Sequence, residues 1–124
     1  GYCVYTSLVP VVMATAEVHC QSISGRLMSV KDLGAMQFLT NYSLTHSVSA
    51  SWIGLDDRVV EGVYIWSDGT PANMSEIAKF CFPGEPTNSN NVEDCFVFEH
   101  RPEGFGLNDG SCTGSFPFIC EYVV

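Results

Sequence analysis

The sequence Gly84-Glu85-Pro86-Thr87-Asn88 is followed by Glu93-Asp94-Cys95 and, further on, by Asn108-Asp109-Gly110-Ser111-Cys112. These stretches gather carboxylate and amide oxygens between two cysteines. Ca²⁺ takes about 6–8 such oxygen ligands at about 2.3–2.6 Å, whereas zinc prefers histidine or thiolate. The pattern therefore predicts Ca²⁺ as a cofactor, held near the surface with coordination positions open to a further ligand.

Length and charge restrict the classes of protein to which the chain can belong. The chain has 124 residues, which predicts a single domain over residues 1–124. A net charge of −9 with only five basic residues argues against nucleic acid and anionic membranes as partners. No apolar run approaches the ~20 residues of a spanning helix, so we expect no membrane insertion.

Cysteines and sequons indicate an oxidising compartment. Six cysteines in a short chain, with no C-x-x-C pair, favour disulfides over a metal ribbon, but about fifteen pairings remain open. Asn41-Tyr42-Ser43 and Asn73-Met74-Ser75 are possible N-glycosylation sites. We therefore expect a secreted, extracellular glycoprotein from which the leader has been removed.

Apolar periodicity predicts two helices followed by short strands. The first helix is expected over residues 15–24, ended by Gly25, and the second over residues 33–44, capped by Asp32. Strands are expected at 52–55, 63–66, 95–99 and 116–122. Residues 67–91 are rich in Gly, Pro, Asn and Ser and are predicted to form a long functional loop.

Together, these motifs carry a specific resemblance. With Trp52-Ile53-Gly54-Leu55, Glu85-Pro86-Thr87, Glu93-Asp94-Cys95 and Asn108-Asp109, the chain resembles the C-type lectin domain across nearly its whole length. The resemblance implies an α+β fold, in which two helices flank small antiparallel sheets below a long calcium-binding loop. It also implies disulfide staples pairing Cys20 with Cys120 and Cys95 with Cys112.

The resemblance leaves Cys3 and Cys81 without assigned partners. We expect Cys3 at the base of the fold and Cys81 near the loop, too far apart for a disulfide, whose Cα atoms must lie within about 7 Å. At least one interchain disulfide in a homodimer is therefore expected. The alternative is an intrachain pair made possible by a rearranged loop.

Five residues match the family's principal calcium site, and two neighbouring sugar hydroxyls would complete the coordination of the ion. They are Glu85, Thr87, Glu93, Asn108 and Asp109. A second set matches an auxiliary calcium site by its spacing: Asp57, Glu61, Asn88, Glu93 and Asp94. The alternative for the first set is solvated loop carboxylates in a domain that has lost calcium, and for Asp57 with Glu61 it is a solvated turn.

The implied activity is calcium-dependent carbohydrate binding, with multivalent agglutination and pattern recognition in innate immunity. Thr87 stands where mannose-type members have Asn. Two specificities for terminal sugars therefore stay open: mannose, fucose or GlcNAc, and galactose. Paired carboxylates are better explained as metal ligands than as a glycosidase pair, so no enzyme is expected. The competing interpretation is a lectin-like module that binds a protein, ice or mineral surface without sugar.

Overall fold

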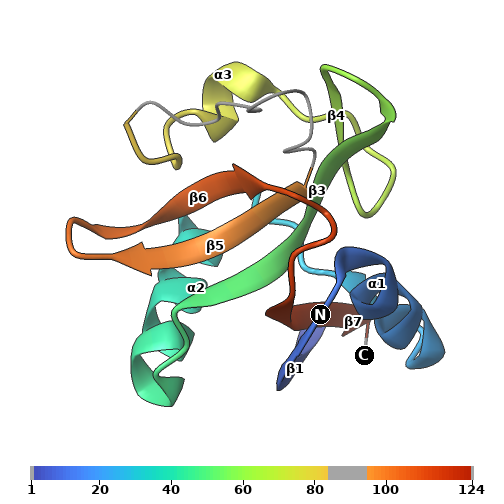
Figure 1. Ribbon diagram of the computed structural model, residues 1–124, viewed down its shortest axis with the longest axis horizontal. Helices are drawn as coiled ribbons and strands as arrows, with labels where there is room; N and C mark the ends of the chain where they lie inside the picture. The colour runs from blue at the N-terminus through green and yellow to red at the C-terminus, as the bar shows by residue number, and fades with distance from the viewer. Residues whose placement is uncertain (1, 84–94, 124) are drawn as a thin grey trace.

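The computed structural model describes residues 2–83 and 95–123. Within them, the chain order is β1 (Tyr2–Val11), α1 (Met13–Ser22), β2 (Arg26–Leu27), α2 (Leu33–His46), β3 (Ala50–Val60), β4 (Val63–Trp66), α3 (Met74–Ile77), β5 (Cys95–Arg101), β6 (Gly104–Gly110) and β7 (Phe116–Val123). Figure 1 shows β1 beside β7, so the two ends of the described chain lie close together. The expected α+β architecture is confirmed.

The described strands form one sheet. Its order is β1-β7-β3-β5-β6, with β2 on β7 and β4 on β3. Every pairing between these strands is antiparallel except a parallel bridge, Trp52 to Phe118, where β3 meets β7. That bridge joins a lower set of strands, which carries the chain ends, to an upper set formed by β3, β4, β5 and β6 (Figure 1).

Both predicted helices exist, with corrected ends. The first begins at Met13 rather than residue 15, because Met13 is buried and its N–H lies 3.3 Å from the Cys112 carbonyl. It ends at Ser22, and the N–H of Gly25 closes the turn on the Cys20 carbonyl at 2.8 Å. A Cβ on Gly25 would lie 2.6 Å from the Glu121 carbonyl oxygen, so a larger residue would force the backbone to move.

The second helix is capped as expected and runs longer. The Asp32 carboxylate accepts a hydrogen bond from Ala35 N–H at 2.8 Å, which satisfies one of the donors exposed at a helix start. The helix continues past Leu44 to His46, whose ring stacks on Tyr42 at 4.1 Å. Ser47 then adopts a left-handed conformation and ends it.

The sequence pattern found some strands and missed others. β4 has the predicted bounds, while β3, β5 and β7 extend beyond their predicted cores. β1, β2 and β6 were not predicted. The prediction of an uninterrupted loop over residues 67–91 was wrong in part, because residues 74–77 form the short helix α3, which is capped by the Asn73 side chain.

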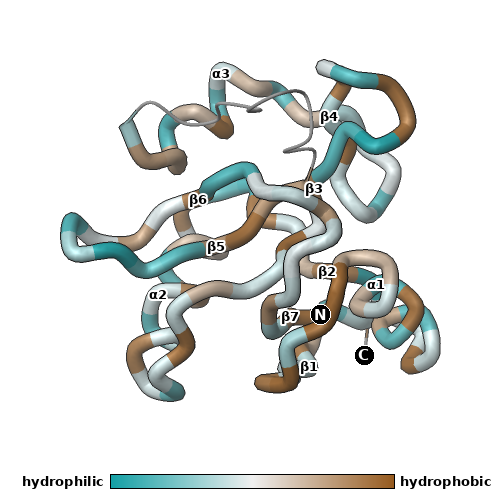
Figure 2. Tube along the Cα trace, viewed as in Figure 1, coloured by the Kyte–Doolittle hydropathy of each residue, from teal (hydrophilic) through white to brown (hydrophobic). Residues whose placement is uncertain are grey.

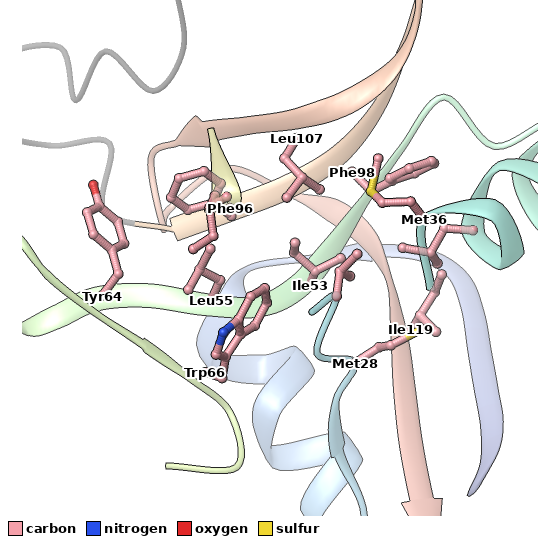
Figure 3. Packing of buried hydrophobic residues seen from close by; sticks show 13 residues of the cluster. Met28, Met36, Ile53, Leu55, Tyr64, Trp66, Phe96, Phe98, Leu107 and Ile119 are labelled. Carbon is pink, nitrogen blue, oxygen red and sulfur yellow. The ribbon is translucent and has the colours of Figure 1, made fainter. Parts of the chain in front are cut away.

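The described residues form two buried clusters, one that includes residues of α2 and one that includes residues of α1. In Figure 3, Ile53 and Leu55 of β3 face Phe96 and Leu107 of the neighbouring hairpin, and Met36 of α2 closes the cluster. Figure 2 shows the same division along the chain: the start of β5 is hydrophobic, whereas the turn between β5 and β6 is hydrophilic. Burial of these strands fixes the upper hairpin, which carries the candidate site.

Two disulfides hold the fold, as the resemblance implied. Cys20 to Cys120 ties α1 to β7, and Cys95 to Cys112 closes the chain that follows β6. Cys3 lies in the outer strand β1, whereas Cys81 bridges to Leu107 of β6, at the opposite edge of the sheet. Four strand spacings, about 19 Å in all, separate these edges, so an intrachain Cys3–Cys81 bond does not fit this fold.

Candidate calcium and carbohydrate site

The described half of the predicted principal site lies on β6. Asn108 pairs with Val97 of β5, and Asp109 pairs with Phe96. Leu107, the residue before Asn108 in the same strand, has no exposed surface and anchors β6 in the core. Asn108, which is half-buried, and Asp109, which is buried, therefore lie in a regular ladder, which restricts the movement of their backbone.

Asn108 presents a buried acceptor that suits a cation. Its Oδ1 is buried, and within residues 2–83 and 95–123 it accepts no hydrogen bond. A buried unsatisfied acceptor costs about 1–3 kcal/mol, so native proteins rarely keep one without a role. Next along the strand, the Asp109 carboxylate has no exposed surface. Amide and carboxylate oxygens are the ligand types that Ca²⁺ takes.

The described residues alone do not complete a metal site. Among them, no group of three or more His, Cys, Asp or Glu side chains is placed to hold an ion. The other predicted ligands of the principal site, Glu85, Thr87 and Glu93, lie outside the described residues. Their role in binding calcium stays a prediction.

The chain on both sides of residues 84–94 is attached to β6. Before that segment, Leu107 N–H donates to the Phe80 carbonyl at 2.8 Å and Phe82 N–H donates to the Leu107 carbonyl at 3.3 Å. After it, Cys95 pairs with Gly110 and bonds to Cys112. The described chain thus leaves and re-enters beside the strand that carries Asn108.

The auxiliary set is described in part. Asp57 is buried, at 2% exposure, and its carboxylate accepts a hydrogen bond from Gly62 N–H at 2.7 Å. Its neighbour Asp56 pairs with Cys95, so the end of β3 lies beside the start of β5. Glu61 is exposed in the turn between β3 and β4. Asn88, Glu93 and Asp94 lie outside the described residues.

These positions bear on the solvated-turn alternative. Asp57 is not a solvated turn residue, because its carboxylate is buried and organises the turn. A basic residue also lies here: Arg58 contacts both Glu17 and Asp56. Although burial alone would lower it, the hydrogen bonds that Arg58 donates to these carboxylates raise the pKa of Arg58. Asp56 thus shares the positive charge of Arg58 with Glu17.

Two features of the site escaped sequence reasoning. One is that Asn108 and Asp109 belong to a strand, β6, rather than to a loop. The alternation of Phe105 and Leu107 with glycines in Gly104-Phe105-Gly106-Leu107 is the period-2 signal that could have found it. The other is that Cys81 and its neighbours pack along Leu107, for which no local pattern exists.

Comparison with known proteins identifies the family. The family model described as the lectin C-type domain matches residues 10–122. Human "C-type lectin domain family 4 member K" is 36% identical over 117 residues, which cover 94% of this chain and 34% of that protein. Ladderlectin from Oncorhynchus mykiss is 38% identical over 104 residues, covering 82% of this chain and 52% of that protein.

A solved structure gives the same result. The carbohydrate-recognition domain of cow CD23, solved in the presence of a GlcNAc2Man3 oligosaccharide, superposes with a TM-score of 0.81 at 28% identity, covering 99% of this chain and 88% of that one. The chain therefore belongs to the C-type lectin family and is a carbohydrate-recognition domain, a binding domain and not an enzyme. It spans about a third to a half of the length of the two curated relatives named above.

Proposed function

We propose that this protein is a secreted lectin that binds the terminal monosaccharides of glycans in a calcium-dependent manner. The observation that carries the proposal is the buried Asn108 Oδ1, which accepts no hydrogen bond from the described residues, followed in sequence by the buried Asp109, in a family for which calcium-dependent sugar binding is the norm. Two disulfides fit an extracellular location. No helix of the described residues is both long and apolar enough to cross a membrane.

Asn108 and Asp109 would hold the ion from β6, while Glu85, Thr87 and Glu93 would hold it from the adjoining segment. When bound, the ion supplies coordination positions for two neighbouring hydroxyls of a sugar. The protein groups then set which hydroxyl pair fits. Carboxylate oxygens accept hydrogen bonds from hydroxyl protons, and the Asn108 amide N–H groups donate to sugar oxygens.

Thr87 is the residue expected to set specificity. Its hydroxyl can ligate an ion, but it lacks the two N–H donors of the asparagine found in mannose-type members. Glu85 favours mannose, fucose or GlcNAc, and the loss of the amide relaxes the preference toward galactose. The cow CD23 structure, which was solved with an oligosaccharide containing mannose and GlcNAc, supports testing the first group of sugars first.

An auxiliary calcium ion is the second part of the proposal, with ligands Asp57, Glu61, Asn88, Glu93 and Asp94. The burial of Asp57 beside the start of β5 supports it. Since Glu93 belongs to both sets, this ion would fix the segment that also serves the sugar site. Each carboxylate must be deprotonated to bind the ion, so acid would release both ions together.

Multivalency is the third part. Cys3 lies on β1, which is the edge strand of the described sheet, and Cys81 lies at the opposite edge. We propose a homodimer linked by one of these cysteines, which would let two sites bind one glycosylated surface. Linking two weak sites raises avidity only when both can bind at once. Agglutination in innate immunity is the biological role that such a dimer would serve.

A glycan array run in calcium and again in EGTA tests the calcium mechanism. Wild-type protein should bind a defined set of terminal sugars in calcium only. Glu85→Ala should lose this binding while keeping the fold, whereas Glu103→Ala, which changes an exposed turn glutamate, should retain it. Binding by wild type that survives EGTA would refute the calcium mechanism, and silence in both buffers would favour a protein, ice or mineral ligand.

A further inference from the structure

The chain has two N-glycosylation sequons, at Asn41 and Asn73, and both asparagines are exposed. Both end in serine, so their third residues do not separate them. Space does not separate them either: Asn73 borders a groove of about 280 Å³ and Asn41 borders one of about 520 Å³. The backbone and hydrogen bonds around each asparagine do differ, and these are what an acceptor site needs.

Asn73 has the conformation of a surface turn. Its backbone is extended, with φ −92° and ψ 107°, just before the four-residue helix α3. Its Oδ1 accepts hydrogen bonds from Ser75 N–H at 3.0 Å and from Ser75 Oγ at 2.6 Å. No described residue accepts a hydrogen bond from its amide nitrogen. The two sequon side chains are therefore already in contact, and Nδ2 points to no competing partner.

This arrangement uses only residues 73–75, so it can form before the rest of the protein folds. Asx-type turns of this kind arise from local hydrogen bonds alone. Surface turns are also where a bulky, solvated glycan is accommodated in a secreted protein.

Asn41 lies in a different setting, within α2. Its carbonyl accepts a hydrogen bond from Thr45 Oγ1 at 2.9 Å. Ser43 is only 4% exposed, and its carbonyl accepts from Val48 N–H at 3.0 Å. Residues two apart on a helix do not face each other, so the Ser43 hydroxyl cannot reach the Asn41 side chain while α2 is formed.

We propose that Asn73 carries an N-linked glycan and that Asn41 does not. In the reaction, Nδ2 of Asn73 forms a bond to the anomeric carbon of an oligosaccharide donated by a polyprenyl diphosphate. The bond between that carbon and the diphosphate oxygen breaks, the lipid diphosphate leaves, and Nδ2 loses one proton. The glycan then projects from the start of α3 over the groove bordered by Lys31, Thr70 and Phe80.

The test is peptide mass mapping of the full chain, secreted from cultured animal cells. An N-glycosidase that converts glycosylated Asn to Asp in ¹⁸O-water labels each occupied site. We expect the label at Asn73 in most molecules and unmodified Asn41. Label at Asn41, or absence of label at Asn73, would overturn the proposal.

Variants give a second reading on gels. Asn73→Asp keeps the side-chain oxygen that starts α3 and should remove the glycosidase-sensitive band shift. Ser75→Ala should also remove it while leaving Asn73 in place. Asn41→Asp is the matched control and should leave the shift unchanged. A shift that persists in Asn73→Asp and disappears in Asn41→Asp would assign the glycan to α2 and refute the inference.

Discussion

Replacing Asn108 by leucine should change stability in opposite directions with and without calcium. Within the described residues, Asn108 Oδ1 is buried and accepts no hydrogen bond, and such an atom costs about 1–3 kcal/mol. Because the residue as a whole is only partly buried, we take the lower end. In EGTA, Asn108→Leu should therefore raise the free energy of unfolding by about 1 kcal/mol, or about 4 °C in Tm for a domain of this size.

Calcium should reverse this order. A ligand at 100 times its Kd stabilises the protein that binds it by about 2.7 kcal/mol, and the leucine variant cannot supply the amide oxygen. In excess calcium, wild type should thus unfold at higher temperature than the variant, and wild type should shift more between buffers than the variant, which keeps only the proposed auxiliary ion. Differential scanning calorimetry in both buffers measures each difference.

The control for this experiment is Asn41→Leu. It changes the same residue type on the exposed side of α2 and should stay within about 0.5 kcal/mol of wild type in both buffers. If Asn108→Leu is less stable than wild type in EGTA, the buried oxygen has a partner and the argument for a cation fails. If the variant gains as much stability from calcium as wild type does, Asn108 does not hold an ion.

Two further predictions concern the scaffold. Replacing both Cys20 and Cys120 by alanine removes a disulfide that joins residues separated by 100 positions. Urea unfolding should show that the free energy of unfolding falls by about 4.7 kcal/mol. Cys3→Ser is the control and should leave the monomer as stable as wild type; an equal loss in both variants would refute the loop-entropy account. Burial would raise the pKa of Asp68, but hydrogen bonds from Lys31 and Thr70 hold this pKa well below its ordinary value. Ionised Asp68 therefore stabilises the fold at any pH above its ordinary pKa. This stabilisation is lost as the pH falls through the lowered pKa. Asp68→Asn should therefore lower the stability at pH 7 by no more than about 1 kcal/mol, with the difference shrinking in strong acid, and a difference that grows in acid would contradict the assignment.

Local signals in the sequence predicted the parts of the fold that are governed by local rules. Asp32 as a helix cap and the bounds of β4 were both found, because capping and period-2 alternation act over a few residues. β1 and β2 were missed for the opposite reason. Tyr2–Val11 becomes a strand only because it pairs with β7 at the far end of the chain, and tertiary pairing of this kind leaves no local pattern.

The candidate site was predictable in its chemistry and less so in its placement. Residue types and spacing indicated Asn108 and Asp109 as oxygen ligands. They could not show that Asp57 would be buried on β3, which is separated from β6 by β5, because burial of a carboxylate depends on the whole surrounding fold. Nor could they show the bonds from Leu107 to Phe80 and Phe82, which join segments far apart in the sequence.

These bonds, with the Cys95–Cys112 disulfide, have a consequence for engineering and evolution. The chain on either side of residues 84–94 is fixed to the same strand whatever sequence connects the two ends, since its anchors at Phe82 and Cys95 are backbone hydrogen bonds and a disulfide. The intervening eleven positions can therefore be exchanged as a cassette with little effect on the core. New ligand preferences would be acquired by grafting that segment from another member of the family, while β6 continues to supply the same asparagine and aspartate.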